Sequence, residues 1–331
     1  MRECSVEQAT RERHYGDPVV TRDTTNEGPV PFAVPERLQV VDSTNRYLLN
    51  LASAGLPGGL EVPEGYAVVA EHQSEGRGRL ARSWVAPPGT AVLCSILLKA
   101  DLGPEQLHLA AWAVALAAVQ ACRAAAGVEL SLKWPNDLIM VTGGAGGNAE
   151  AHARRAEAEQ KVAGILSEIL PPSTEDGPGG RVARRSNWVV VGIGINVNWA
   201  PGWPPADSQD PDLVSIAASA TSLNRIAGRQ IDRSELTGRL LAGIGTCSAM
   251  LASHEGRRGL ASQYLQACAT IGREVRVELV DGTVTGRALG LDDAGCLLVS
   301  TGGCIRTVSA GDVVHVRCAV ARWARRCSGS G

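Results

Sequence analysis

The sequence predicts an α+β protein with a second, small β domain towards its C-terminal end. A long alanine-rich segment, residues 104–127, has the composition of a helix and lies among short apolar segments that are typical of strands. After Gly272, four turn signals separate five short segments of alternating polarity, which is typical of a small barrel or sandwich. We therefore expect an α+β domain over residues 38–268 and a β domain over residues 269–318.

The elements of the larger domain follow from apolar segments and from the cap and turn residues between them. Short apolar segments predict strands at residues 38–41, 66–71, 91–98, 131–134, 138–141, 162–169 and 188–197. Helices are expected at residues 104–127, 213–220, 233–250 and 259–268. A further helix, capped by Asp42, Ser43 or Thr44, should bury an apolar face and end near Gly55.

Four stretches lie outside this pattern. Residues 1–37 are polar and aperiodic and residues 319–331 are basic, so we expect both to be disordered tails. The low-complexity stretches 143–160 and 171–186 are expected to loop out as insertions at hairpin tips. The first insertion separates Asp137 from Lys161, so it must loop out if both residues reach one site.

Charge and composition exclude several classes of protein. With 32 basic and 34 acidic residues, the net charge of −2 supplies no global field for nucleic acid or an anionic membrane. The longest purely apolar run, residues 109–119, is too short to span a bilayer, and the N-terminus is charged rather than apolar. The nine cysteines and six histidines show no C-x-x-C or zinc-site spacing. We therefore expect a cytoplasmic protein without a membrane or nucleic-acid partner.

The strongest chemical signal is the loop Gly76-Arg77-Gly78-Arg79-Leu80-Ala81-Arg82. Its glycines permit close approach of a ligand, and its guanidinium groups match phosphate and carboxylate oxygens. The spacing also matches the dinucleotide fingerprint G-x-G-x-x-A, but that motif must open a helix, whereas this loop runs on to Pro87-Pro88-Gly89. The sequence therefore predicts an anion-binding loop, and the alternative is a solvated basic loop.

Only three of the 32 basic residues are lysines, Lys99, Lys133 and Lys161. A lysine retained among so many arginines hints at a site that needs a compact ammonium, although chance placement is the alternative. Lys161 opens an otherwise apolar strand, where an ammonium suits a phosphate or carboxylate. Lys99 lies at a strand end and is expected to be solvated.

Two further motifs carry polar groups at strand ends. Lys133-Trp134-Pro135-Asn136-Asp137 combines a cation, an aromatic ring, a rigid turn, an amide and a carboxylate that can help to hold Mg²⁺. The run Gly192-Ile193-Gly194-Ile195-Asn196-Val197-Asn198 has glycines that permit close approach of a backbone or base, and Asn196 can read an adenine-like edge. An ordinary strand-ending turn and a packed strand are the respective alternatives.

Taken together and in chain order, these segments resemble those of the biotin protein ligases. The matching motifs are Val41-Asp42-Ser43-Thr44-Asn45, Gln73 with Gly76-Arg77-Gly78-Arg79 and Trp84, Lys133-Trp134-Pro135-Asn136-Asp137, Lys161-Val162-Ala163-Gly164-Ile165-Leu166 and Gly192-Ile193-Gly194-Ile195-Asn196. The resemblance covers about residues 38–318 and implies a class II synthetase-like mixed sheet with helices, followed by an SH3-like β-barrel. It implies the monofunctional type of ligase, because the 37 residues before the first strand are too few and too acidic for an N-terminal DNA-binding domain.

The resemblance implies a two-step reaction that uses ATP and Mg²⁺. The carboxylate of biotin attacks the α-phosphate of ATP to give biotinyl-5′-AMP and pyrophosphate. A lysine on a biotin carboxyl carrier domain of acetyl-CoA carboxylase or a related acyl-CoA carboxylase then attacks this mixed anhydride. Catalysis of this kind depends on positioning and charge stabilisation.

The same resemblance assigns roles to individual residues. The residues implied for biotin are Ser43, Thr44, Asn45, Gln73, Gly76, Arg77, Gly78, Arg79, Trp84, Lys161 and Gly164. Those implied for ATP are Arg79, Lys133, Asn136 and Asn196. Lys161, Arg77 and Arg79 are the expected catalytic residues, and Asp137 is the expected Mg²⁺ ligand.

Some points depart from the family pattern or stay open. Glu75 and Ala81 stand where the family usually has small residues or glycine, and either can stiffen the loop or weaken its affinity for anions. A lipoate or octanoate ligase of the same fold and a non-enzymatic, biotin-responsive regulator are the alternatives. The oligomeric state, monomer or homodimer, is left open by the sequence.

Overall fold

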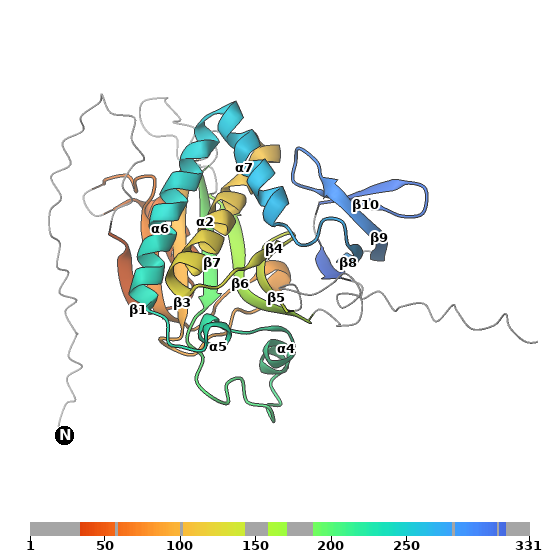
Figure 1. Cartoon of the computed structure of the whole chain (residues 1–331). Helices are drawn as coiled ribbons and strands as arrows, with labels where there is room; N and C mark the ends of the chain where they lie inside the picture. Colours follow the sequence, from red (N-terminus) through yellow and green to blue (C-terminus); the bar gives the residue numbers. More distant parts are fainter. Residues whose placement is uncertain are drawn as a thin grey trace, which may run out of the picture.

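The computed structural model describes residues 34–56, 59–99, 102–142, 158–170, 188–279, 282–309 and 311–315 (Figure 1). Its larger part is a seven-stranded mixed sheet in the order β1-β2-β3-β7-β6-β5-β4. The strands are β1 (Glu36–Val41), β2 (Ala67–Gln73), β3 (Ala91–Lys99), β4 (Ser131–Lys133), β5 (Asp137–Thr142), β6 (Ala158–Ile169) and β7 (Trp188–Asn196). β1 and β2 pair in parallel, and the other neighbours pair antiparallel.

One face of this sheet is covered by the helices α2 (His108–Ala126), α6 (Arg233–Ala249) and α7 (His254–Ala267) (Figure 1). The packing is close because the facing residues are small: a Cβ added at Gly243 of α6 would lie 3.2 Å from the Cβ of Ala117 in α2. The helix α2 is long and apolar enough to cross a membrane, but 72% of its most apolar window is buried inside the fold, as in the core helix of a globular domain.

The other face is only partly covered. The helix α1 (Thr44–Ala54) packs there through Leu48 and Ala52 against β2, β3 and β7, as the sequence predicts. Two shorter helices, α4 (Pro211–Ser219) and α5 (Leu223–Ala227), follow β7 at one end of the sheet (Figure 1). Among the described residues, the loop after β2 folds back over the middle of β6 and β7 on this face, where Trp84 packs against Gly164 and Gly194.

The second part of the chain is a five-stranded antiparallel sheet in the order β11-β10-β9-β8-β12. Its strands are β8 (Glu274–Leu279), β9 (Gly282–Leu291), β10 (Leu297–Ser300), β11 (Ile305–Val308) and β12 (Asp312–His315). The five strands that the sequence predicts after Gly272 are confirmed. The indole nitrogen of Trp134 donates to the carbonyl of Gly295 at 2.9 Å, so the two sheets are in direct contact.

The boundaries differ from the predictions at a few points. β6 begins at Ala158, inside the stretch expected to be an insertion, because Glu159 and Gln160 pair with β5. β1 begins at Glu36, inside the expected tail, and the carboxylate of Glu36 accepts hydrogen bonds from Tyr47 and Tyr66.

The helix α7 starts five residues earlier than expected because the side chain of Ser253 caps it, and the short helix α5 was not predicted. The expectations for residues 1–33, 143–157, 171–187 and 316–331 concern stretches outside the described residues.

Candidate functional site

A cavity of about 120 Å³ lies on the sheet face that carries α1, between the start of α1, the Gly/Arg loop and the middle of β6 and β7. Twelve of the residues predicted for the site line it: Ser43, Thr44, Asn45, Gln73, Arg77, Gly78, Arg79, Trp84, Asn136, Asp137, Lys161 and Gly164. Segments from four distant parts of the sequence therefore meet at one place, as the motifs predict.

The first turn of α1 supplies a buried polar wall. Ser43, one of the three predicted caps, occupies the N-cap position, but its side chain makes no capping hydrogen bond. The side-chain oxygen of Gln73 instead accepts hydrogen bonds from the backbone N–H and the hydroxyl of Thr44, at 2.8 and 2.9 Å. Because Gln73 satisfies the helix end, the hydroxyl of Ser43 is left to face the cavity.

Asn45 is held from several sides at the base of the cavity. Its Nδ2 group donates to the carbonyl of Leu166 at 3.1 Å and to the carboxylate of Glu168 at 2.9 Å, while its Oδ1 lies 2.6 Å from the hydroxyl of Ser95. Any side chain at Gly192 would overlap the amide of Asn45. Ser95 was missed by the motif analysis, although it is the only hydroxyl residue in an otherwise apolar strand, and that irregularity was the available signal.

The indole of Trp84 packs against two glycines in adjacent strands. Gly164 and Gly194 are direct partners in the β6–β7 ladder, and a Cβ at either would press against the ring. The ammonium of Lys161 lies 5.6 Å from the ring centroid, within the range of a cation–π contact. The glycines of β7 were expected to admit a backbone or base, but the structure shows that they admit the side chains of Asn45 and Trp84.

The Gly/Arg loop folds back on itself. The N–H of Trp84 donates to the carbonyl of Gly76 and the N–H of Gly78 donates to the carbonyl of Arg82. Any side chain at Gly76 would collide with the backbone of Trp84, so this glycine serves the fold of the loop and lies outside the cavity wall. At the tip, Leu80 has a φ of 53° and is exposed, and among the described non-glycine residues it alone has a positive φ.

Each arginine of the loop contacts a different element. Arg77 pairs with Glu168 of β6 at 3.0 Å, and Arg82 pairs with Asp312 of β12 in the second sheet. Arg79 lies 3.4 Å from the side-chain oxygen of Asn136, and burial lowers its pKa although Asp137 acts in the opposite direction. Two of the three arginines therefore have carboxylate partners within the protein.

Asp137 and Lys161 form an ion pair of 2.7 Å in the cavity wall. No cluster of three or more histidine, cysteine, aspartate or glutamate side chains that could hold a metal ion occurs among the described residues. Asp137 can therefore act as a single carboxylate ligand, which fits Mg²⁺ only where substrate phosphates and water supply the other oxygens.

A second cavity, of about 420 Å³, shares Trp84, Asp137, Lys161 and Asp312 with the first. Of the four predicted ATP residues, Lys133, Asn136 and Asn196 line it, whereas Arg79 lines only the first cavity. All three already have partners: the ammonium of Lys133 pairs with Glu159 at 3.1 Å, and the amides of Asn136 and Asn196 donate to the carbonyls of Ile165 and Thr221. The second cavity is therefore lined on one side by charged residues that it shares with the first cavity. On its other side, the predicted ATP residues already have hydrogen-bond or ion-pair partners within the protein.

Comparison with known protein families finds that two segments of the chain match family models. Residues 38–176 match the model of the Biotin/lipoate A/B protein ligase family, and residues 270–316 match that of the Biotin protein ligase C terminal domain.

The chain is 34% identical over 283 residues to the biotin–[acetyl-CoA-carboxylase] ligase of Mycobacterium tuberculosis, covering 83% of this chain and 86% of that protein. It is 30% identical over 260 residues to the corresponding ligase of Paracoccus denitrificans, covering 78% and 90%. A solved structure of biotin protein ligase from Aquifex aeolicus, in complex with biotin and ATP, superposes with a TM-score of 0.61 at 26% identity and covers 86% of this chain and 98% of that one. These matches show that the chain belongs to the biotin protein ligase family.

Proposed function

We propose that the protein attaches biotin to a lysine of a biotin carboxyl carrier domain in an ATP-dependent reaction that passes through biotinyl-5′-AMP. The observation that carries this proposal is the pair of adjoining cavities that share Lys161, Asp137 and Trp84. Two substrates bound in adjoining spaces would meet at these residues. The names of the relatives and the biotin and ATP bound to the solved ligase support this assignment.

The smaller cavity suits biotin. Its base is polar, with Ser43, Thr44 and Asn45 at the start of α1, and can hydrogen-bond the ureido group of a bicyclic ring. The indole of Trp84 supplies an apolar surface beside it. Arg77, Arg79 and Lys161 line the same cavity and can pair with the biotin carboxylate.

The larger cavity suits ATP. Asn136 and Lys161 lie where the two cavities meet, so the α-phosphate can be placed next to the biotin carboxylate. Attack of that carboxylate on the α-phosphorus forms the mixed anhydride and releases pyrophosphate. Bound Mg²⁺ would neutralise phosphate charge, with Asp137 as its one carboxylate ligand from the protein.

In the second step, the amine of the acceptor lysine would attack the acyl carbon, the bond from that carbon to the AMP oxygen would break, and AMP would leave. The cationic groups of Arg77, Arg79 and Lys161 would stabilise the negative charge that develops on the leaving phosphate. The acceptor that we propose is the carrier domain of acetyl-CoA carboxylase or of a related acyl-CoA carboxylase.

The six cysteines among the described residues, Cys94, Cys122, Cys247, Cys268, Cys296 and Cys304, are all free thiols. Burial raises the pKa of Cys94 and Cys122 to about 12, so these thiols are unreactive. Free thiols of this kind support the proposal that the protein works in the reducing environment of the cytoplasm.

The proposal is tested by mass spectrometry of a purified carrier domain incubated with the protein, ATP, Mg²⁺ and biotin. The carrier should gain the mass of one biotinyl group, and omission of either ATP or biotin should abolish the gain. A parallel incubation with lipoate and octanoate distinguishes the related ligases that share the family model. Transfer of lipoate or octanoate but not of biotin would overturn the assignment, and biotin binding without transfer would indicate a regulator.

A further inference from the structure

One carboxylate beside the biotin cavity belongs to none of the expected motifs. Glu168 lies on β6, two residues beyond Leu166 and four beyond Gly164, both of which line the cavity. Alternate residues of a strand point to the same face, so Glu168 points towards the same side of the sheet. Its side chain is 22% exposed and lies next to the cavity wall rather than in it.

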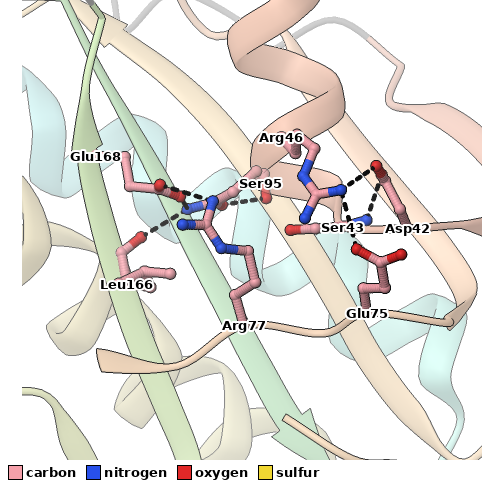
Figure 2. Close-up of polar contacts among 9 residues, drawn as sticks. Asp42, Ser43, Arg46, Glu75, Arg77, Ser95, Leu166 and Glu168 are labelled. Carbon is pink, nitrogen blue, oxygen red and sulfur yellow. Dashed lines mark hydrogen bonds and ion pairs between the residues drawn. The ribbon is translucent and has the colours of Figure 1, made fainter. Parts of the chain in front are cut away.

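The two oxygens of Glu168 bind two different residues of the cavity wall (Figure 2). Oε1 accepts a hydrogen bond from Arg77 at 3.0 Å, and Oε2 accepts one from Asn45 at 2.9 Å. Asn45 belongs to α1 and Arg77 to the Gly/Arg loop. This carboxylate therefore connects two segments that enclose the cavity from different sides.

We propose that Glu168 is a positioning residue for the biotin site, an inference that rests on the proposed function. Glu168 would act in two ways, on the orientation of the Asn45 amide and on the place of the Arg77 guanidinium. Neither action requires Glu168 to touch the substrate.

The first action follows from the polarity of the amide. A carboxylate can only accept hydrogen bonds, so Glu168 directs the NH₂ end of Asn45 towards itself and the oxygen end towards Ser95. The hydroxyl of Ser95 also lies 2.7 Å from that of Thr44, which faces the cavity. Together with the carbonyl of Leu166, which accepts from the same amide at 3.1 Å, Glu168 therefore sets the pattern of donors and acceptors presented to a ureido group.

The second action concerns the loop. Arg77 is 44% exposed, and among the described residues its carboxylate partner is Glu168. A long side chain without that partner would be free to turn into solvent, and its rotamer entropy would then have to be lost when the substrate binds. The carboxylate keeps the guanidinium over the cavity before the substrate carboxylate arrives.

Glutamine cannot replace Glu168 at both ends. Its amide offers an acceptor at one end and a donor at the other, so either Arg77 or Asn45 would face a donor. E168Q therefore preserves shape and volume and loses one of the two contacts whichever way it turns.

A matched control lies two residues before Arg77 in the chain. Glu75, at the start of the same loop, pairs with Arg46 at 3.0 Å, and Arg46 also pairs with Asp42 at 2.9 Å (Figure 2). Arg46 and Glu75 lie outside the walls of both described cavities. E75Q removes a carboxylate from the same loop without altering a cavity contact.

The test measures KM for biotin and for ATP, kcat for carrier biotinylation and Tm for the wild type, E168Q and E75Q. We expect E168Q to raise KM for biotin by about tenfold, the effect of losing one charge-assisted contact, with KM for ATP and Tm close to those of the wild type. E75Q should change KM for biotin less than twofold. In an R77A background, E168Q should have a smaller effect, because one of its two partners is already missing.

A rise in both KM values together with a fall in Tm would overturn the proposal in favour of a merely structural role, and so would a KM for biotin within twofold of the wild type. If E168Q does not fold, E168D decides the matter. It keeps two acceptor oxygens but withdraws them by one methylene, and should raise KM for biotin while Tm is retained. A wild type that binds no biotin would refute the proposed function itself, and this inference with it.

Discussion

Two lysine–carboxylate pairs in this molecule look alike in the sequence and differ in the structure. Lys161 pairs with Asp137 in the wall that the two cavities share. The side chain of Lys161 is about one-third exposed and that of Asp137 about one-quarter exposed. Lys133 pairs with Glu159 where the two sheets meet, and Glu159 is also bound by Arg273 and by His315. Among the described residues, Asp137 thus pairs with one lysine in the wall of both cavities, whereas Glu159 pairs with three basic residues in a partly buried junction that borders only the second cavity.

The difference shows that the residue type alone does not reveal which lysine serves the substrate. At Glu159, burial alone would raise the pKa, but the hydrogen bond and charge of His315, together with Lys133, outweigh it and lower the pKa to about 2. A carboxylate held so firmly stabilises the fold and leaves little of its lysine for a ligand. Lys161, by contrast, can exchange its partner for a phosphate or carboxylate oxygen.

The largest effect is expected from Lys161→Arg. The planar guanidinium is wider than an ammonium and would meet Trp84 and Gly164, which both lie within contact of Lys161. We expect kcat/KM for biotinylation to fall by roughly 100-fold or more, with Tm unchanged. Lys99→Arg, at an exposed strand end, is the control and should keep full activity.

Lys133→Arg sharpens the same comparison. Arginine can keep the pair with Glu159, so this variant should retain most of the activity that Lys161→Arg loses. Equal losses in the two variants, measured in one assay, would contradict the division into a substrate lysine and a structural lysine.

The second prediction concerns Glu159→Gln. Glu159→Gln removes the carboxylate from a partly buried charged cluster and weakens its contacts with Lys133, Arg273 and His315, so the free energy of unfolding at pH 7 should fall by roughly 2–4 kcal/mol. Glu129→Gln, in an exposed pair with Arg123, should cost less than about 0.5 kcal/mol. Urea denaturation of both variants measures the two losses.

The pH dependence has a definite sign. The folded pKa of Glu159 lies below its ordinary value of 4.5, so its stabilisation is fully present above pH 4.5 and is lost as the pH falls through about 2. The gap between the wild type and Glu159→Gln should therefore narrow between pH 5 and pH 2.5. A gap that is constant over this range would show that the lost charge is not its cause.

The sequence predicted the elements best where the determinants are local. Apolar runs marked the seven strands of the large sheet to within a few residues, and Gly55 and Gly127 end their helices as expected. Twelve of the residues that the motifs assign to the site line one cavity. These features depend on residues close to one another in the chain or on the family resemblance.

The sequence does not reveal contacts between residues that are far apart in the chain and meet only in the folded protein. Glu159 was assigned to a loop because its partners Arg273 and His315 lie 114 and 156 positions away. Glu168 belongs to none of the expected motifs, because Asn45 and Arg77 reach it from 123 and 91 positions away. Asn196 was assigned to adenine, but its amide donates to the carbonyl of Thr221. Pairings of this kind depend on sheet order, which no local pattern encodes.

The third prediction extends the comparison to the Gly/Arg loop, whose charges face the cavity as Lys161 does. Arg79→Ala removes the most buried arginine of the loop, and we expect the bound adenylate to be released about 10-fold faster, with little change in Tm.

Limited proteolysis after Arg77 or Arg79 should be fast in the free protein and slow with biotin and ATP, because the tip at Leu80 is exposed and strained. Equal cleavage in both states would leave the loop as a static basic edge.

The smallest effect is expected from Asp312→Asn, which breaks the contact between the Gly/Arg loop and the second sheet. The side chains of Arg82 and Asp312 are 66% and 32% exposed, and an exposed ion pair contributes roughly 0.2–1 kcal/mol. Both residues nevertheless line both cavities, so the loss should appear in retention of the adenylate more than in folding. We expect release to quicken by about two- to fivefold at low salt, and the difference should shrink at high salt because an exposed pair is screened. Glu235→Gln, which breaks the equally exposed pair with Arg239 in α6, is the control and should leave adenylate release unchanged. If the two variants behave alike, the contact between the loop and the second sheet is only a surface ion pair; if Asp312→Asn exceeds the effect of Arg79→Ala, the second sheet holds the loop more firmly than the cavity does.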